Sequence, residues 1–128
     1  MENQIRYTST RNRGISVTAS QAVLQGLAPD GGLFVPETIP HYAGSFEKLS
    51  GQSYQETALE IMSMLLTDYT REELEQCIRS AYDSKFDIPE ITRLKKADGA
   101  WYLELFHGAT IAFKDMALSI LPHLMTCA

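Results

Sequence analysis

The sequence contains 128 residues, of which 45% are hydrophobic and 21% are charged, a balance that argues against disordered, collagen-like and coiled-coil proteins. Eleven Lys and Arg against sixteen Asp and Glu give a net charge of −5, and no basic cluster of the kind that binds nucleic acid is present. The apolar stretches are shorter than the roughly 20 residues that span a bilayer, and the N-terminus lacks the pattern of a secretory signal. We therefore expect no nucleic-acid partner, no membrane partner and a cytoplasmic location.

The first third of the chain alternates short elements with turns. Residues 5–8 predict a short strand, and Thr18 is placed to cap a helix over residues 19–25. The Pro-Asp-Gly-Gly sequence at 29–32 is typical of a tight turn, because proline presets φ and glycine allows φ > 0. A short buried strand is expected to follow at 33–35.

Two amphipathic helices with clear starts are predicted next. Ser53 is followed three residues later by Glu56, and Thr70 is followed three residues later by Glu73, which is the spacing of a capping box. Behind each cap, apolar residues recur every three or four positions, as they do on one face of a helix. These apolar positions are Ala58, Ile61, Met62, Leu65 and Leu66 in the first helix, and Leu74, Cys77, Ile78 and Ala81 in the second.

The stretch after the second helix predicts a linker and a hairpin. Residues 85–89 have the composition of a linker, and residues 91–94 and 101–106 have that of strands. The Asp-Gly pair at 98–99 between them is a strong short-range signal for a hairpin.

The last segment, from residue 104 onward, combines a strand, a turn and a helix. The turn is expected at residues 107–108, Thr110 is the expected capping residue, and the helix is predicted from about residue 112. Pro122 should kink this helix or mark its end. Lys114 then falls in the first turn of the helix.

A lysine is unusual at that position. The positive end of the helix dipole disfavours an ammonium group and so favours the neutral, nucleophilic amine, the form that reacts with carbonyl compounds such as pyridoxal phosphate. Asp115 beside it could offset the charge of the protonated lysine. The plain alternative is a solvated first turn in which Lys114 points to water, and the physical argument alone leaves both readings open.

Cysteine and histidine residues give no metal or disulfide signal. Cys77 and Cys127 are far apart in the sequence and lack a Cys-x-x-Cys or Cys/His ligand spacing. His41, His107 and His123 are too scattered to predict a metal site.

Two motifs carry a resemblance to a known family. Glu-Leu-Phe-His-Gly-Ala-Thr-Ile-Ala-Phe-Lys-Asp at 104–115 resembles the threonine synthase motif, in which a His-Gly-Pro-Thr turn leads into Ala-Phe-Lys-Asp. Residues 7–11 and 26–40 are similar to the opening of the same family's N-terminal domain. Ala109 stands where the family has proline, which should leave the turn less rigid.

The resemblance implies both a fold and a domain division. Residues 1–88 would be the α+β N-terminal domain of threonine synthase type, and residues 89–128 the first elements of a fold-type II pyridoxal-phosphate α/β domain. The family's glycine-rich phosphate loop and the partner of the pyridine nitrogen would lie beyond residue 128. The remainder of the same polypeptide is therefore an expected partner.

The resemblance also implies a reaction, the conversion of O-phospho-L-homoserine and water to L-threonine and phosphate. Lys114 would be the catalytic and cofactor-binding residue, holding pyridoxal 5'-phosphate as a Schiff base and then moving protons. His107, Thr110 and Asp115 are candidates to line the site, although a turn-shaping histidine and a plain helix cap account equally well for the first two. The alternatives are a threonine-synthase-like phospho-lyase that releases a keto acid, and a folding or interaction module without catalysis. Without the phosphate loop, residues 1–128 alone are expected to be inactive.

Overall fold

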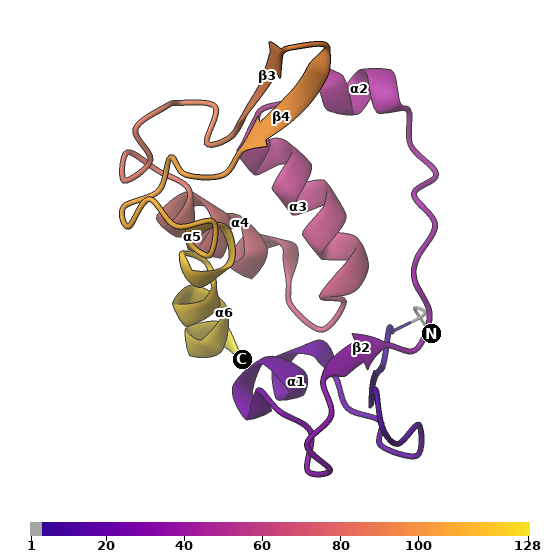
Figure 1. Ribbon diagram of the computed structural model, residues 1–128. Helices are drawn as coiled ribbons and strands as arrows, with labels where there is room; N and C mark the ends of the chain where they lie inside the picture. Colours follow the sequence, from indigo (N-terminus) through magenta and orange to yellow (C-terminus); the bar gives the residue numbers. More distant parts are fainter. Residues whose placement is uncertain (1–3) are drawn as a thin grey trace.

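Two helices form the centre of the computed structural model, which describes residues 4–128. They are α3 (Tyr54–Leu65) and α4 (Arg71–Ala81), and they pack against each other. A strand pair lies near each end of α3, with β1 and β2 at its C-terminal end and β3 and β4 at its N-terminal end (Figure 1). The remaining elements are β1 (Tyr7–Ser9), α1 (Ala19–Gln25), β2 (Phe34–Pro36), α2 (Phe46–Ser50), β3 (Arg93–Ala97), β4 (Ala100–Glu104), α5 (Asp115–Leu118) and α6 (Leu121–Cys127).

The predicted helix starts are confirmed by hydrogen bonds. Thr18, Ser53 and Thr70 are the N-caps of α1, α3 and α4, and each closes a capping box with the residue three positions on. The side-chain oxygen of each cap accepts a hydrogen bond from a backbone N–H that the helix itself leaves unpaired. Local chemistry therefore fixes where these three helices begin.

The two early strands form with shifted boundaries and pair with each other. The prediction that the second strand is buried is wrong, because none of residues 33–35 is buried. β1 and β2 are antiparallel, with Tyr7 opposite Pro36 and Ser9 opposite Phe34, so both strands lie slightly further along the chain than predicted. The Pro-Asp-Gly-Gly turn holds them together, because Asp30 Oδ1 accepts hydrogen bonds from Ser9 Oγ at 2.8 Å and from the Gly32 N–H at 2.9 Å. These two hydrogen bonds lower the pKa of Asp30, and the bond from Gly32 has the larger effect.

The predicted hairpin forms at the Asp-Gly pair. β3 and β4 pair antiparallel from Arg93 opposite Glu104 to Ala97 opposite Ala100. Asp98 and Gly99 both have positive φ, 49° and 78°, as the tight turns that suit twisted hairpins require. The prediction of a strand over 91–94 is wrong at its start, because Ile91 is buried with a φ of 64° and lies before the strand.

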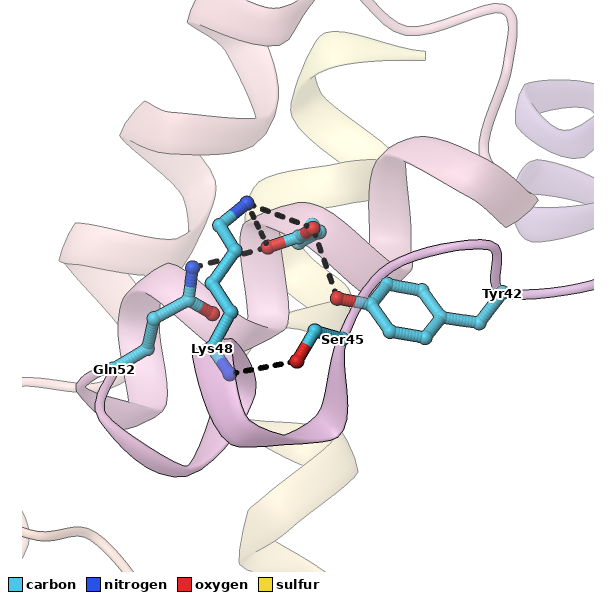
Figure 2. Close-up of polar contacts among 5 residues, drawn as sticks. Tyr42, Ser45, Lys48 and Gln52 are labelled. Atoms are coloured by element: carbon cyan, nitrogen blue, oxygen red, sulfur yellow. Dashed lines mark hydrogen bonds and ion pairs between the residues drawn. The ribbon is translucent and has the colours of Figure 1, made fainter.

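Helix α2 was not predicted, and a polar cluster centred on Glu60 of α3 anchors it. Tyr42, Lys48 and Gln52 contact the Glu60 carboxylate at 3.1, 3.2 and 3.0 Å respectively. Figure 2 labels these three residues and draws their contacts as dashed lines. These contacts lower the pKa of Glu60, and the hydrogen bond from Gln52 has the largest effect. Because α2 has no buried residue, hydrophobic periodicity could not reveal it.

The prediction of one last helix from about residue 112 is wrong. Residues 112–114 form bends and turns, and the helical region is divided into α5 and α6. Pro122 stands in the first turn of α6, where its missing N–H leaves no hydrogen bond unmade. Pro122 therefore helps to begin a helix instead of kinking or ending one.

One hydrophobic core joins the early and late parts of the chain. Helix α6 contacts both α1 and α4, and its Leu124 is buried in the same cluster as Ala19 of α1 and Leu74 of α4. The other buried members are Leu59, Tyr69, Cys77, Ile78, Ala81, Tyr82, Phe86, Ile91 and Ile120. Within residues 4–128, no helix is long and apolar enough to cross a membrane.

Candidate active site

Lys114 lies at the edge of an open hollow of about 500 Å³. The residue is exposed and forms the N-cap of α5, one position before the helix proper. The walls of the hollow are mainly apolar and come from α3, the hairpin and the α5 region. Its lining comprises Tyr54, Thr92, Leu103, Leu105, Phe113, Lys114, Met116, Ala117 and Leu118.

The turn before Lys114 is closed by the neighbouring aspartate. Asp115 is only 6% exposed, and its two carboxylate oxygens accept hydrogen bonds from the Thr110 N–H at 2.8 Å and the Thr110 hydroxyl at 2.6 Å. The prediction that Thr110 caps the last helix is therefore wrong, since its hydroxyl donates to Asp115 and accepts from no helix N–H. Asp115 instead holds a small loop that presents Lys114 at its end.

Two backbone features of this loop are unusual: one position requires glycine, and another holds a β-branched residue in a strained conformation. A Cβ at Gly108 would lie 2.5 Å from both Cβ and Oδ2 of Asp115, so the loop can close only with glycine at this position. Ile111 has a φ of 65°, a conformation that a β-branched residue rarely adopts. Strain of this kind persists only where the surrounding contacts enforce it, and it often accompanies functional loops.

His107 is buried between two carboxylates. Its Nδ1 lies 2.6 Å from Asp87 Oδ1, and its Nε2 lies 3.0 Å from Glu104 Oε2. Burial alone would lower the pKa of His107, but hydrogen bonds and negative charge from Glu104 and Asp87 outweigh it and raise that pKa above 6.5. When protonated, the ring can donate both N–H groups, and it ties Glu104 at the end of β4 to Asp87 in the segment between α4 and β3.

The candidate residues are close in sequence, but they do not all face one cavity. Among residues 4–128, the lining of the hollow includes Lys114 but not His107, Thr110 or Asp115. No ion pair to the Lys114 amine is found within this range either. The three flanking residues therefore shape the loop, and Lys114 alone of the four borders the hollow.

The helix-dipole argument for Lys114 is weakened by the structure. The helix that follows it, α5, is only four residues long, and few aligned peptide dipoles contribute at its N-terminus. The distinctive property of Lys114 is its place beside the hollow, which depends on the tertiary fold.

Of the lining residues, sequence reasoning found only Lys114, and two of those that it missed are distant from the lysine in the sequence. Tyr54 starts α3 and Thr92 precedes β3, so neither lies near Lys114 in the sequence. Tyr54 packs edge-on against Tyr82 with ring centroids 4.8 Å apart. Burial raises the pKa of Tyr54. Its only sequence signal was its position directly after the Ser53 cap.

Two tyrosines that flank α4 hold the segment around Lys114 and the last helix. The Tyr82 hydroxyl donates to the backbone carbonyl of Met116 at 2.7 Å, and the Tyr69 hydroxyl donates to that of Leu124 at 3.2 Å. The first bond falls two residues after Lys114. The position of the lysine is therefore linked to the core beneath α4.

The early arginines belong to a different region. Arg13 lines a second hollow, of about 470 Å³, bordered by residues of β1 and β2. Arg11 donates to the carbonyl oxygen of Asp30 at 3.3 Å. Within the described residues, neither arginine lines the hollow beside Lys114, and no group of three or more potential ligands could hold a metal ion.

Comparison with known proteins connects this geometry to a family. The family described as the threonine synthase N terminus matches residues 6–82, more than half of the chain. The chain belongs to the threonine synthase family. The family match ends shortly before the segment that carries Lys114.

Individual relatives extend the similarity across almost the whole chain. Threonine synthase from Schizosaccharomyces pombe is 42% identical over 97% of the chain, and threonine synthase-like 2 from Xenopus laevis is 39% identical over 94%. The crystal structure of pyridoxal-phosphate-bound threonine synthase from Brucella melitensis superposes with a TM-score of 0.83 at 34% identity over 94% of the chain. The chain spans about a quarter of each relative, 25%, 26% and 26% respectively.

Proposed function

We propose that this chain supplies the front domain and the cofactor lysine of a threonine synthase. The enzyme would convert O-phospho-L-homoserine and water to L-threonine and phosphate. The observation that carries the proposal is Lys114, which stands in the Ala-Phe-Lys-Asp motif at the edge of a hollow of about 500 Å³. Residues 1–88 would form the front domain, and residues 89–128 would begin the cofactor domain of a fold-type II enzyme.

The residues around Lys114 fit pyridoxal phosphate. The exposed amine can reach into the hollow, whose size falls within the range of roughly 300 to 1,000 Å³ common for small-molecule sites. When bound, pyridoxal phosphate supplies an electron sink. Lys114 would hold the cofactor covalently and, once substrate releases it, would take up and return protons at Nζ.

The neighbouring residues would position Lys114. Asp115 and Thr110 close the loop that ends at the lysine, while the Tyr82 hydroxyl fixes the carbonyl of Met116 just beyond it. The apolar walls would exclude water from one side of the bound group. His107 would act at a distance by joining the end of β4 to the segment between α4 and β3.

A chimera can test the assignment of Lys114. Residues 1–128 would replace the matching first quarter of the Schizosaccharomyces pombe enzyme, to which they are 42% identical. After incubation with pyridoxal phosphate and reduction with borohydride, peptide mass spectrometry should find the cofactor on Lys114. Lys114→Ala should abolish both the labelled peptide and the visible absorbance of the bound cofactor, whereas Lys95→Ala, at an exposed position on β3, should preserve both. Normal cofactor absorbance in the Lys114→Ala chimera would remove the lysine from its role.

The 128-residue chain alone is expected to release no phosphate from O-phospho-L-homoserine. The chain spans only about a quarter of its relatives, and it lacks the glycine-rich phosphate loop expected beyond residue 128. Phosphate release is measured with the chain and pyridoxal phosphate, and with the chimera as the positive control. Release by the chain alone would show that residues 1–128 form a complete site.

A threonine-synthase-like phospho-lyase is the second candidate, since the Xenopus laevis relative named threonine synthase-like 2 has comparable identity. Both reactions would use Lys114 and release phosphate, but they differ in the organic product. The two reactions can be distinguished by chromatography of the products, using the full-length protein of which this chain is proposed to be a part. L-threonine supports the first candidate, and a keto acid supports the second.

A further inference from the structure

The two cysteines lie side by side in the folded chain. Cys77 belongs to α4 and Cys127 to the last turn of α6, and their Sγ atoms are 3.6 Å apart. Their wide separation in the sequence had argued against a disulfide, but the packing of α6 against α4 brings them together. Both are free thiols, with Cys77 buried and Cys127 exposed.

We propose that Cys77 and Cys127 form a site of reversible oxidation, at which a peroxide converts the two thiols to a disulfide linking α4 and α6. A disulfide needs an S–S distance of about 2.0 Å, so the sulfur atoms must approach by roughly 1.6 Å. Because Cys127 is exposed in the last turn of a short helix, a side-chain rotation with a small shift of that turn is sufficient.

The difference in exposure sets the order of the chemical steps. Burial, followed by the hydrogen bond with Cys127, raises the pKa of the Cys77 thiol to about 12, so Cys77 is a poor first nucleophile. The exposed Cys127 thiolate attacks hydrogen peroxide, forms a sulfenic acid and releases hydroxide. The Cys77 sulfur then attacks the sulfenic sulfur, and the departing hydroxide leaves as water with the thiol proton of Cys77. In total, two thiols and one peroxide give one disulfide and two waters.

The link would reinforce an existing contact. The Tyr69 hydroxyl already donates to the carbonyl of Leu124 in α6 at 3.2 Å, and Leu124 is buried in the common core. A covalent bond one turn later would keep α6 on α4 even when these contacts break. Oxidation should therefore raise the thermal unfolding midpoint of the chain, and a reducing agent should return it to its starting value.

The test uses the 128-residue chain and dilute hydrogen peroxide. The monomer should lose the mass of two hydrogen atoms, both cysteines should resist alkylation after unfolding, and a peptide joining Cys77 to Cys127 should appear without reductant. Dithiothreitol should reverse all three changes. The experiment measures thiol chemistry and needs no cofactor, so its outcome is independent of the proposed function.

Two variants assign the steps. In Cys127→Ser, which changes an exposed position, the buried Cys77 should stay alkylatable after the same peroxide treatment. In Cys77→Ala, Cys127 should gain oxygen, because no second thiol is available to trap the sulfenic acid. The proposal is overturned if the unsubstituted chain gains oxygen on Cys127 while Cys77 remains a thiol. It is equally overturned if the disulfide joins only separate copies of the chain.

Discussion

The charge of His107 connects one side chain to the stability of the whole fold. Asp87 and Glu104 raise the pKa of this buried ring above its usual value of 6.5. A group whose pKa is higher in the folded than in the unfolded state adds stability that is fully present below the unfolded value and is lost as the pH rises through the folded value. The contribution of His107 should therefore be complete below its unfolded pKa of about 6.5 and be lost as the pH rises through the higher folded pKa.

Replacing His107 should remove this pH dependence. In His107→Gln the side chain can still donate a hydrogen bond but has no charge to lose. The loss of unfolding free energy between pH 6 and pH 9 should be smaller in the variant than in the unsubstituted chain, as measured by urea unfolding at several pH values. His123→Gln, at a partly buried position in α6, is the matched control. Parallel pH profiles for His107→Gln and the unsubstituted chain would contradict the prediction.

At the scale of elements, helix α4 shows how a local signal and a packing signal act together. Thr70 and Glu73 cap its N-terminus, and the face that carries Leu74, Cys77 and Ile78 is only 1% exposed at each of these residues. The cap removes an unpaired N–H, and the buried face stabilises the helix against the core.

Removing the Thr70 cap should destabilise the chain. Thr70→Ala removes the hydroxyl that accepts a hydrogen bond from the Glu73 N–H at 3.2 Å. This change should lower the free energy of unfolding by about 1 kcal/mol. Ser45→Ala, at the cap of helix α2, is the control and should cost clearly less, because its hydrogen bond is longer, 3.5 Å, and α2 has no buried residue behind the cap. Urea unfolding of both variants measures the difference, and equal costs would contradict the prediction.

On the scale of the whole molecule, two tyrosine hydroxyls at the ends of α4 join this part of the core to the segment that follows Lys114. Tyr82 is buried and donates to the carbonyl of Met116, and Tyr69 donates to that of Leu124. Burial is the main cause of a raised pKa at both tyrosines, reaching about 12 at Tyr69. Both therefore remain protonated donors at physiological pH.

Loss of the Tyr82 hydroxyl should loosen the segment around Lys114. Tyr82→Phe keeps the ring in the core but leaves the Met116 carbonyl without its donor, which should cost about 1 to 2 kcal/mol. Amide hydrogen exchange should accelerate more in α5, where the Met116 carbonyl loses its donor, than in α1. Tyr102→Phe, on the exposed face of β4, serves as the control. Uniform acceleration in every helix would indicate general destabilisation instead of local release.

The sequence by itself determined the family, three helix starts, the hairpin turn and the identity of the candidate lysine. Each depends on neighbouring residues, as in the capping boxes at Ser53 and Thr70 or the turn at residues 98–99. Such short-range interactions can be recognised from the order of the residues alone. It also explains why the boundaries of these elements were nearly correct.

Only the tertiary structure decided which distant residues meet. It placed Tyr54 in the wall beside Lys114, His107 between Asp87 and Glu104, and the Cys77 sulfur next to that of Cys127. It also delayed the start of the last helical region to Asp115, because Asp115 bonds to Thr110 and holds the preceding loop out of helical conformation. These contacts arise when helices bury their apolar faces against one core, and the pairs that this burial brings together have no fixed spacing in the sequence.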